Sequence, residues 1–230
     1  MHRKAEDRER ANASVWVNIA ILGLALLMYA LLASPRSVAS MTGKSAPKYR
    51  GASRDSISLQ CVVGWNASAL GGILDTLKEK GVNITFAVGG EWARRNPDML
   101  RRIAEEGHGI AVTVSNSAGE IEGQLKDALG IVESVTGVRP SVCCCVGGPP
   151  QEIAKAAVSL GLDAVLCTAD LDCAGADAGL ILKRLANCAE AGYMIDVQPT
   201  RSLMEALPEI INYLKNVGLA IVPTHKMLYN

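Results

Sequence analysis

The sequence predicts an α/β fold in which about seven parallel β-strands alternate with helices, preceded by one transmembrane helix. Three observations predict it. From residue 57 onward, short apolar runs alternate with amphipathic stretches, as strands and helices do in such folds. A glycine follows each amphipathic stretch, where it can take the left-handed conformation that ends a helix. Residues 15–33 form an apolar run broken only by Asn18, close to the roughly 20 residues that span a bilayer.

The predicted strands read as largely continuous apolar runs separated by helices, the pattern of parallel strands that are buried on both faces. These strands are residues 57–63, 82–88, 109–114, 141–145, 164–168, 193–197 and 219–222. The predicted helices are residues 69–80, 92–106, 118–136, 150–160, 178–191 and 202–216. The glycines that follow them are Gly81, Gly107, Gly137, Gly161, Gly192 and Gly218. A barrel and a wound open sheet both accommodate seven such strands, and periodicity alone does not choose between them.

The N-terminal part divides into three segments. Residues 1–14 are predicted to be a cytoplasmic N-terminal segment and residues 15–33 a transmembrane anchor. Residues 34–55, rich in Ser, Ala, Gly and basic residues, predict a flexible tether to a domain at 56–230. A cleaved signal peptide is the alternative, because small residues follow the apolar run at Ser37 and Ala39. Basic residues flank the run on both sides, so charge does not settle its orientation.

Charge and cysteine content exclude some classes of protein. The chain has 23 basic and 23 acidic residues, so no strong field favours a nucleic-acid partner, and we expect none. Its seven cysteines include the run Cys143–Cys145, but no CxxC pair typical of zinc sites. We therefore expect reduced, mostly buried thiols that act as small apolar side chains.

Functional groups of parallel α/β folds lie at the carboxyl ends of the strands. In this sequence those ends carry few titratable residues, whereas a metal hydrolase ordinarily shows a cluster of histidines and carboxylates there. The candidates for ligand binding at these ends are Trp65, Asp170, Asp172 and Gln198.

Residues 73–117, ILDTLKEKGVNITFAVGGEWARRNPDMLRRIAEEGHGIAVTVSNS, closely resemble the polysaccharide deacetylase family, which is also called the NodB-homology domain or carbohydrate esterase family 4. The resemblance continues through Arg139-Pro140 and EALPEIINYLKNVGLAIV at 205–222, and it covers nearly all of residues 57–228. It implies a distorted (β/α) barrel of about seven strands. It also implies that His108, in the family's Gly-His turn, has a structural role.

The family chemistry that this resemblance implies is removal of an N-acetyl or O-acetyl group from an envelope or chitin-like glycan. One Asp and two His hold a divalent metal that activates water, a second Asp is the base and a late His is the acid. Val62 stands at the position of the base and Val63 at that of the metal-binding Asp. Thr113 and Ser117 replace the two metal-binding histidines.

The remaining motifs are changed as well. Cys143 stands where the third motif has its Arg, Gln198 replaces the acid, and Asp170 alone keeps an acidic residue. Valine has no lone pair with which to bind a metal or accept a proton, and an amide is no general acid. We therefore expect that the family reaction is absent and that no metal or other cofactor is bound.

A zinc site through Cys61, Cys143 and Cys145 is the alternative for the former centre. It is disfavoured because consecutive residues of a strand point to opposite faces. The preferred hypothesis is a pseudoenzyme in the cell membrane, single-pass, with its domain outside the cytoplasm. Its partner would be an envelope glycan or another membrane or envelope protein. The alternatives are a divergent hydrolase of non-peptide carbon–nitrogen bonds with a cysteine- or Asp170-based site, and a purely structural or regulatory membrane protein.

Overall fold

The computed structural model describes residues 46–65, 67–114 and 120–229. The predicted cytoplasmic segment, the predicted anchor at 15–33 and most of the predicted tether lie outside these ranges. In the part of the chain that is described, every helix is too short or too polar to cross a bilayer.

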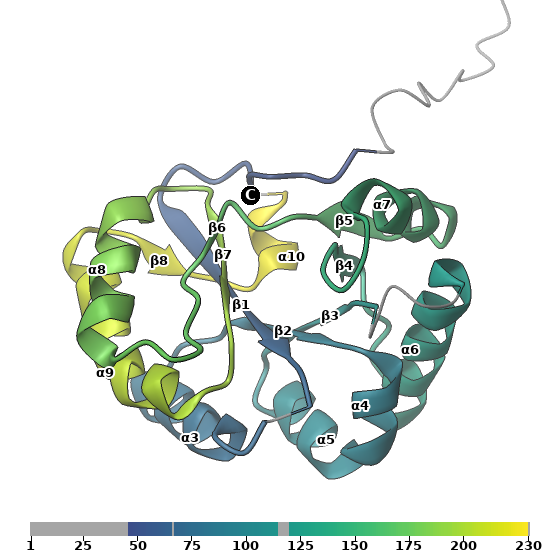
Figure 1. The fold of residues 1–230 in the computed structure, drawn as a ribbon, viewed down its shortest axis with the longest axis horizontal. Coiled ribbons are helices and arrows are strands. Elements are labelled where there is room, and N and C mark those ends of the chain that lie inside the picture. Colours follow the sequence, from purple (N-terminus) through teal and green to yellow (C-terminus); the bar gives the residue numbers. More distant parts are fainter. Residues whose placement is uncertain (1–45, 66, 115–119, 230) are drawn as a thin grey trace, which may run out of the picture. The chain divides into compact units, whose positions relative to one another are not determined.

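A parallel sheet forms the centre of the domain (Figure 1). Its strands follow the spatial order β5-β4-β3-β2-β1-β7-β6, and β8 pairs with the start of β1. The strands are β1 (Ser56–Val63), β2 (Thr85–Val88), β3 (Gly109–Val112), β4 (Val142–Cys144), β5 (Asp163–Val165), β6 (Ala169–Asp170), β7 (Met194–Val197) and β8 (Ala220–Ile221). The sheet is an open half-barrel, which confirms the predicted parallel, barrel-type fold.

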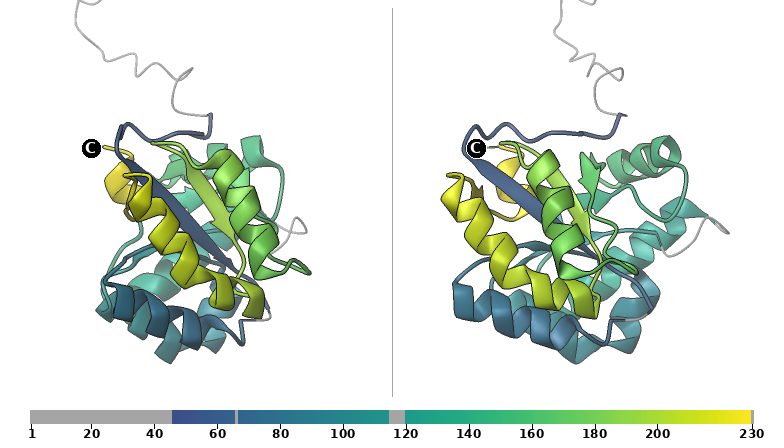
Figure 2. Two further views of the ribbon diagram at one scale, coloured as in Figure 1. Left: turned by 90° about the vertical axis from the view of Figure 1, so that its left-hand side faces the viewer. Right: turned by 60° about the vertical axis from the view of Figure 1, so that its left-hand side comes forward.

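Amphipathic helices cover the outer face of the sheet. They are α3 (Leu70–Lys80), α4 (Gly90–Arg95), α5 (Pro97–Glu105), α6 (Ile121–Thr136), α7 (Pro150–Ser159), α8 (Ala178–Cys188) and α9 (Arg201–Asn216). Both views in Figure 2 show α3 and α9 side by side, where they contact each other. The six glycines predicted to end helices all have positive φ values, from 63° to 80°, as the left-handed conformation requires.

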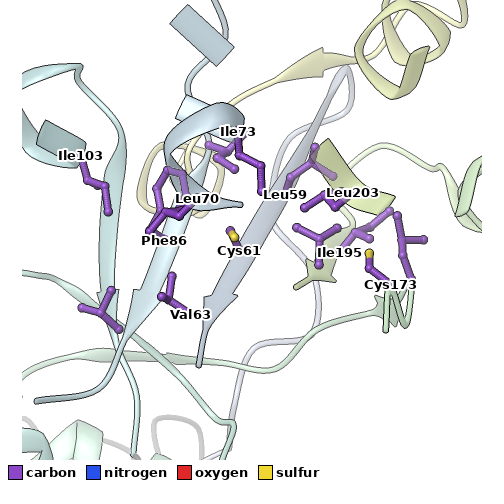
Figure 3. Close-up of a cluster of buried hydrophobic side chains, with 14 of the residues drawn as sticks. Leu59, Cys61, Val63, Leu70, Ile73, Phe86, Ile103, Cys173, Ile195 and Leu203 are labelled. Carbon is purple, nitrogen blue, oxygen red and sulfur yellow. The ribbon is translucent and has the colours of Figure 1, made fainter. Parts of the chain in front are cut away.

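The side chains of β1 alternate between two environments. Leu59, Cys61 and Val63 belong to the large outer core between sheet and helices (Figure 3). Ser58 and Gln60 point the other way, and their side chains hydrogen-bond the buried Thr224 hydroxyl at 2.8 and 3.0 Å. Thr224 begins the short helix α10 (Thr224–Met227). These polar bonds satisfy groups that would be costly to bury alone.

Two predicted elements differ from the structure. The helix predicted at 92–106 is two helices, α4 and α5, separated at Asn96. Pro97 explains the break, because proline disfavours the helical conformation of the residue before it. The strand predicted at 164–168 is replaced by β5 and by β6, which pairs with β7.

Residues 46–55, called the strap below, correct the prediction of a flexible tether that reaches to residue 55. Lys48 pairs with Val165 at β5, and Arg50 pairs with Tyr193 just before β7. The strap therefore runs from β5, at one edge of the half-barrel, to the start of β7, which lies next to the other edge strand, β6. The physical reason is that strap and sheet satisfy each other's backbone groups: the Lys48 N–H donates to the Ala164 carbonyl and the Gly51 N–H to the Gly192 carbonyl, both at 2.8 Å. Composition does not reveal such pairing.

Gly51 is the tightest point of the strap, and its substitution by alanine is expected to destabilise the domain. A Cβ atom there would lie 2.7 Å from the Met227 side chain and 2.9 Å from its carbonyl oxygen. We expect Gly51→Ala to lower the free energy of unfolding by about 1–3 kcal/mol, measured by urea unfolding. The neighbouring exposed residue provides the control, Ala52→Ser, which should change little. Equal stability of the two variants would show that the strap does not hold the domain.

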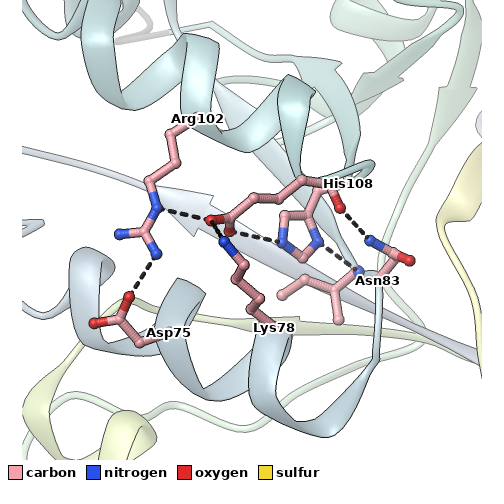
Figure 4. Close-up of polar contacts among 7 residues, drawn as sticks. Asp75, Lys78, Asn83, Arg102 and His108 are labelled. Carbon is pink, nitrogen blue, oxygen red and sulfur yellow. Dashed lines mark hydrogen bonds and ion pairs between the residues drawn. The ribbon is translucent and has the colours of Figure 1, made fainter.

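His108 lies in a polar network between α5 and β3, shown in Figure 4. Its Nδ1 atom accepts a hydrogen bond from the Ile84 backbone N–H at 3.3 Å. Nearby, Glu106 accepts from Arg102 at 3.0 Å, and Asn83 donates to the Glu106 carbonyl at 2.8 Å. The side chain of His108 is 1% exposed, and burial lowers its pKa to about 4. These contacts agree with the structural role expected for His108.

Because His108 is buried and its pKa is lowered, we expect the folded domain to lose stability in acid. Between pH 4 and 6.5 the unfolded chain binds a proton at His108 that the folded chain does not, so the free energy of unfolding falls as pH drops through this window. The loss amounts to about 3 kcal/mol when complete. His108→Gln should flatten the profile, measured by urea unfolding at several pH values. Burial also lowers the pKa of His225, so His225→Gln is the matched variant that reports the second histidine. An unchanged profile in His108→Gln contradicts the prediction.

Candidate ligand-binding site at the carboxyl ends of the strands

A cavity of about 330 Å³ opens at the carboxyl ends of β1 to β4. This is the end of a parallel sheet where ligands bind, and the volume lies at the lower end of the range for small-molecule sites. Its lining comes from the ends of these strands, from the loops that follow them and from α4. The lining residues are Val62, Val63, Gly64, Trp65, Gly89, Glu91, Trp92, Arg95, Asn96, Thr113, Val114, Val146 and Gly147.

The floor of the cavity is aliphatic. Val62 and Val63 end β1, and Val114 and Val146 follow β3 and β4. Among the described residues of the lining, the only hydroxyl group is that of Thr113, which donates a hydrogen bond to the Val146 carbonyl at 2.8 Å. This hydroxyl therefore holds the loop after β4 in place. The four valines can neither bind a cation nor accept a proton from water.

The loop after β4 approaches β3 so closely that only glycine fits. Gly147 has a φ of 90°, and a Cβ atom there would lie 2.3 Å from the Val114 carbonyl oxygen. A positive φ is accessible to glycine at little cost. Gly147 thus determines how near the loop comes to the cavity floor.

The rim of the cavity is aromatic and carries one internal ion pair. The side chain of Trp65 is 71% exposed, and the Arg95 guanidinium lies over its ring, 4.6 Å from the centroid. Arg95 also pairs with Glu91 at 2.8 Å. Asn96 donates to the Trp92 carbonyl at 2.9 Å. Of the four predicted ligand-binding residues, Trp65 alone lines this cavity.

The other three, Asp170, Asp172 and Gln198, lie together beside β6 and β7 and bond to one another and to the backbone. Gln198 donates to the Asp170 carboxylate at 2.9 Å and accepts from the Cys173 backbone N–H at 2.7 Å. The backbone N–H of Asp172 donates to the same Asp170 oxygen at 2.7 Å. Arg184 donates to the Asp172 carbonyl at 2.6 Å. These side chains hold the loop between β6 and α8 and are not directed to the cavity.

The zinc alternative through Cys61, Cys143 and Cys145 is wrong. Cys61 is on β1, whereas Cys143 is on β4 and Cys145 directly follows it. Strands β2 and β3 lie between β1 and β4, so the two strands are about 14 Å apart along the sheet. All three side chains are buried in the outer core. Over the described residues as a whole, no three His, Cys, Asp or Glu side chains are placed to hold a metal ion.

The metal that the family resemblance implies is not matched by the residues present. Val63 and Thr113 occupy two of the three ligand positions, and Thr113 is committed to the Val146 carbonyl. The third position, Ser117, lies outside the described residues. The donor set is therefore aliphatic and hydroxyl, which is a poor match for a divalent cation.

Asp196 is a buried group that the sequence prediction missed. It lies in β7, is 4% exposed, and its Oδ1 atom has no hydrogen-bond partner among the described residues. Burial raises the pKa of its carboxyl to about 7, against the lowering effect of a hydrogen bond from Cys167. A carboxylate in an otherwise apolar predicted strand, 193–197, was the signal that could have identified it.

Comparisons with known proteins agree with this fold. The family model of polysaccharide deacetylases matches residues 63–165. A protein of Bacillus subtilis (strain 168), the uncharacterized protein YlxY, is 26% identical over 171 residues, which are 69% of this chain and 53% of that protein. The chain thus spans about half the length of this relative.

Solved structures are similar over most of the chain. BA3943, a carbohydrate esterase family 4 pseudoenzyme from Bacillus anthracis, is 24% identical with a TM-score of 0.74, over 80% of this chain and 69% of that one. A BA3943 mutant with restored enzymatic activity has a TM-score of 0.75 at 23% identity, over 80% and 71% of the chains. The peptidoglycan N-acetylglucosamine deacetylase Bc1960 has a TM-score of 0.73 at 24% identity, over 83% and 96%. Residues 63–165 of the chain therefore match the polysaccharide deacetylase family, and the fold is that of carbohydrate esterase family 4 enzymes and pseudoenzymes.

Proposed function

We propose that this protein is a membrane-anchored polysaccharide deacetylase-like pseudoenzyme that binds an envelope glycan and does not hydrolyse it. The observation that carries the proposal is an open cavity at the strand ends whose lining includes Val62 and Val63, the first facing the inside of the barrel and the second packed into the outer core. In the family resemblance these two positions belong to the catalytic base and to a metal ligand. A binding site is retained while the reactive groups are gone.

No turnover is expected, because the site lacks the groups that would move protons during hydrolysis. Hydrolysis of an amide needs a group that activates water and a group that protonates the leaving nitrogen. Neither valine can do the first. Gln198, at the acid position, has no ionisable proton, and its amide already bonds to Asp170 and to the Cys173 N–H. Glu91, the carboxylate in the described lining, is held by Arg95 in an ion pair of 2.8 Å, and no described residue of the lining has an acidic proton to give to the leaving nitrogen.

Glycan is the favoured ligand for two reasons. Small-molecule sites are largely apolar with aromatic walls, and Trp65 and Trp92 supply such walls here. Similar structures include a peptidoglycan N-acetylglucosamine deacetylase, so a glycan ligand is compatible with the same scaffold. Membrane anchoring is proposed from the apolar run at residues 15–33. Alkaline extraction of membranes and protease accessibility of the domain test it, since a protein released by alkali is not anchored.

Acetate release tests the loss of activity. The full chain in detergent is incubated with tetra-N-acetylchitotetraose and with peptidoglycan fragments, with and without added zinc or cobalt. We expect no acetate above the protein-free control, together with measurable binding of at least one glycan. Acetate release that a chelator abolishes would overturn the proposal and favour the divergent hydrolase instead.

A further inference from the structure

We propose that one end of the domain docks on the bilayer surface by electrostatic attraction to anionic lipid headgroups, so that the cavity opens away from the membrane. The docking surface, called the strap face below, consists of the strap, α10 and Tyr229. The inference rests on the proposed membrane anchoring and goes further, because it names the surface that contacts the membrane and the lipid chemistry that it selects.

The strap and the C-terminal residues lie side by side, as Figures 1 and 2 show. The Ala52 N–H donates to the Met227 carbonyl at 3.1 Å. Towards the start of the strap, the Lys48 ammonium lies over the Tyr229 ring, 4.9 Å from its centroid. Tyr229 in turn hydrogen-bonds the Asp163 carboxylate. These contacts hold the strap face together and attach it to the sheet.

The strap face lies at the amino ends of strands, opposite the cavity. The strap leads directly into β1, and the Gly51 N–H donates to the Gly192 carbonyl just before β7. Asp163, the partner of Tyr229, is the first residue of β5. The strands are parallel, and the cavity is at the carboxyl ends of β1 to β4. A domain that rests on its strap face therefore opens its cavity away from the lipid, where a glycan strand can reach it.

Basic residues give the strap face its lipid preference. Residues 34–54 contain five basic residues and no acidic residue, although the whole chain has equal numbers of both. Lys48 and Arg50 are already paired with acidic side chains. Arg54 and Lys226 are exposed and form no ion pair with a described residue. Cationic side chains so close to a predicted membrane anchor are attracted by anionic lipid headgroups.

Aromatic side chains and chain length favour the same contact. Tyr49 and Tyr229 are 52% and 69% exposed, and tyrosine is enriched at membrane interfaces because its ring is apolar and its hydroxyl polar. Twelve residues, 34–45, separate the apolar run from the strap, and a chain of that length spans at most about 43 Å. The strap is thus the part of the described domain that the chain ties most closely to the membrane.

Fluorescence quenching by lipids with a nitroxide on the headgroup tests the proposal in the full chain, because quenching requires close approach to the label. Trp16 and Trp92 are replaced by Phe throughout. One protein keeps Trp65 at the cavity rim as its reporter, and the other carries Trp65→Phe with Tyr229→Trp. Tyr49→Trp is a second strap-face reporter should Tyr229→Trp not fold. The proteins are placed in nanodiscs of phosphatidylcholine alone or of equal parts phosphatidylcholine and phosphatidylglycerol.

We expect the nitroxide lipids to quench the Tyr229→Trp reporter strongly in the anionic discs and to quench Trp65 little. Arg54→Gln combined with Lys226→Gln should lower the ratio of docked to undocked domain by about twenty-fivefold, since a basic residue near an anionic surface contributes roughly fivefold.

Lys126→Gln combined with Lys155→Gln is the matched control. These two lysines are exposed on α6 and α7, outside the strap face, and their loss removes the same charge. This control should leave the ratio of docked to undocked domain unchanged.

The outcomes separate docking from anchoring. A chain that alkali releases from membranes is not anchored, and this inference then fails with the anchoring. If the chain is anchored but neither strap-face reporter is quenched, or Trp65 is quenched more strongly, anchoring stands and docking through the strap face is wrong. Equal quenching in discs of phosphatidylcholine alone, or quenching that survives Arg54→Gln with Lys226→Gln, overturns the attraction to anionic lipids.

Discussion

Replacing Gly147 by alanine is expected to lower the free energy of unfolding by about 3 kcal/mol and to displace the loop that lines the cavity. Two effects add. The residue has a φ of 90°, a conformation that costs a residue with a Cβ atom about 1–2 kcal/mol. The new Cβ atom would also lie 2.3 Å from the Val114 carbonyl oxygen and 3.1 Å from a Val114 methyl group. Because the nearest contact is backbone, it cannot move aside as a flexible side chain would.

Gly161→Ala is the matched control. Gly161 has a similar φ of 77°, but a Cβ atom there would meet nothing within 4 Å. This variant therefore isolates the conformational cost, and its loss should be about 1–2 kcal/mol. Urea unfolding followed by circular dichroism measures both. If the two variants lose the same stability, the close approach of the loop to Val114 is not a constraint on the cavity.

The consequence for binding is separate from stability. A displaced loop moves Val146 away from the cavity floor, so Gly147→Ala should weaken binding of tetra-N-acetylchitotetraose even at temperatures where the variant remains folded. Gly161→Ala, at the end of α7, should not. This comparison links one backbone conformation to the proposed ligand site.

The sequence predicts the arrangement of the domain well, because the features that define it are local. Apolar runs report burial, and glycines such as Gly81 and Gly218 report helix ends through a conformation that other residues rarely adopt. The strand ends follow from these boundaries, and a cavity of the described residues lies at the ends of β1 to β4. The break between α4 and α5 at Asn96 could also have been predicted, since Pro97 disfavours a helical conformation of the residue before it.

Contacts between distant segments could not be predicted from the sequence. Gln198 and Asp170 are predicted as ligand-binding groups, but they bond to each other across 28 residues of sequence. The strap has the composition of a linker, yet Lys48 and Arg50 pair with strand edges that exist only in the folded sheet. In both cases the deciding partner is set by tertiary geometry, on which composition and periodicity carry no information.

The raised pKa of Asp196 could not be predicted from the sequence either, because it depends on burial within the barrel. Its pKa of about 7 means that, between about pH 4 and 7, the folded chain holds a proton that the unfolded chain has released. The free energy of unfolding should therefore fall as pH rises through this window and level off above it. The effect of Asp196 on the free energy of unfolding is opposite in sign to that of His108, which lowers this free energy as the pH drops.

Asp196→Asn should remove this penalty, since an amide is neutral at every pH and resembles the protonated carboxyl in shape. The variant should match the parent near pH 4 and exceed it by up to about 4 kcal/mol above pH 7. Urea unfolding of both proteins at pH 4 to 8 measures the difference, and the contribution of His108 cancels because both chains contain it. Asp98→Asn, at an exposed carboxylate that pairs with Arg101 at 2.6 Å, is the control for loss of a surface carboxylate, and its difference should stay below about 1 kcal/mol. If the difference for Asp196→Asn does not vary with pH, the carboxyl is already ionised in the folded protein at acid pH, and the unpartnered oxygen must have a water or cation beside it.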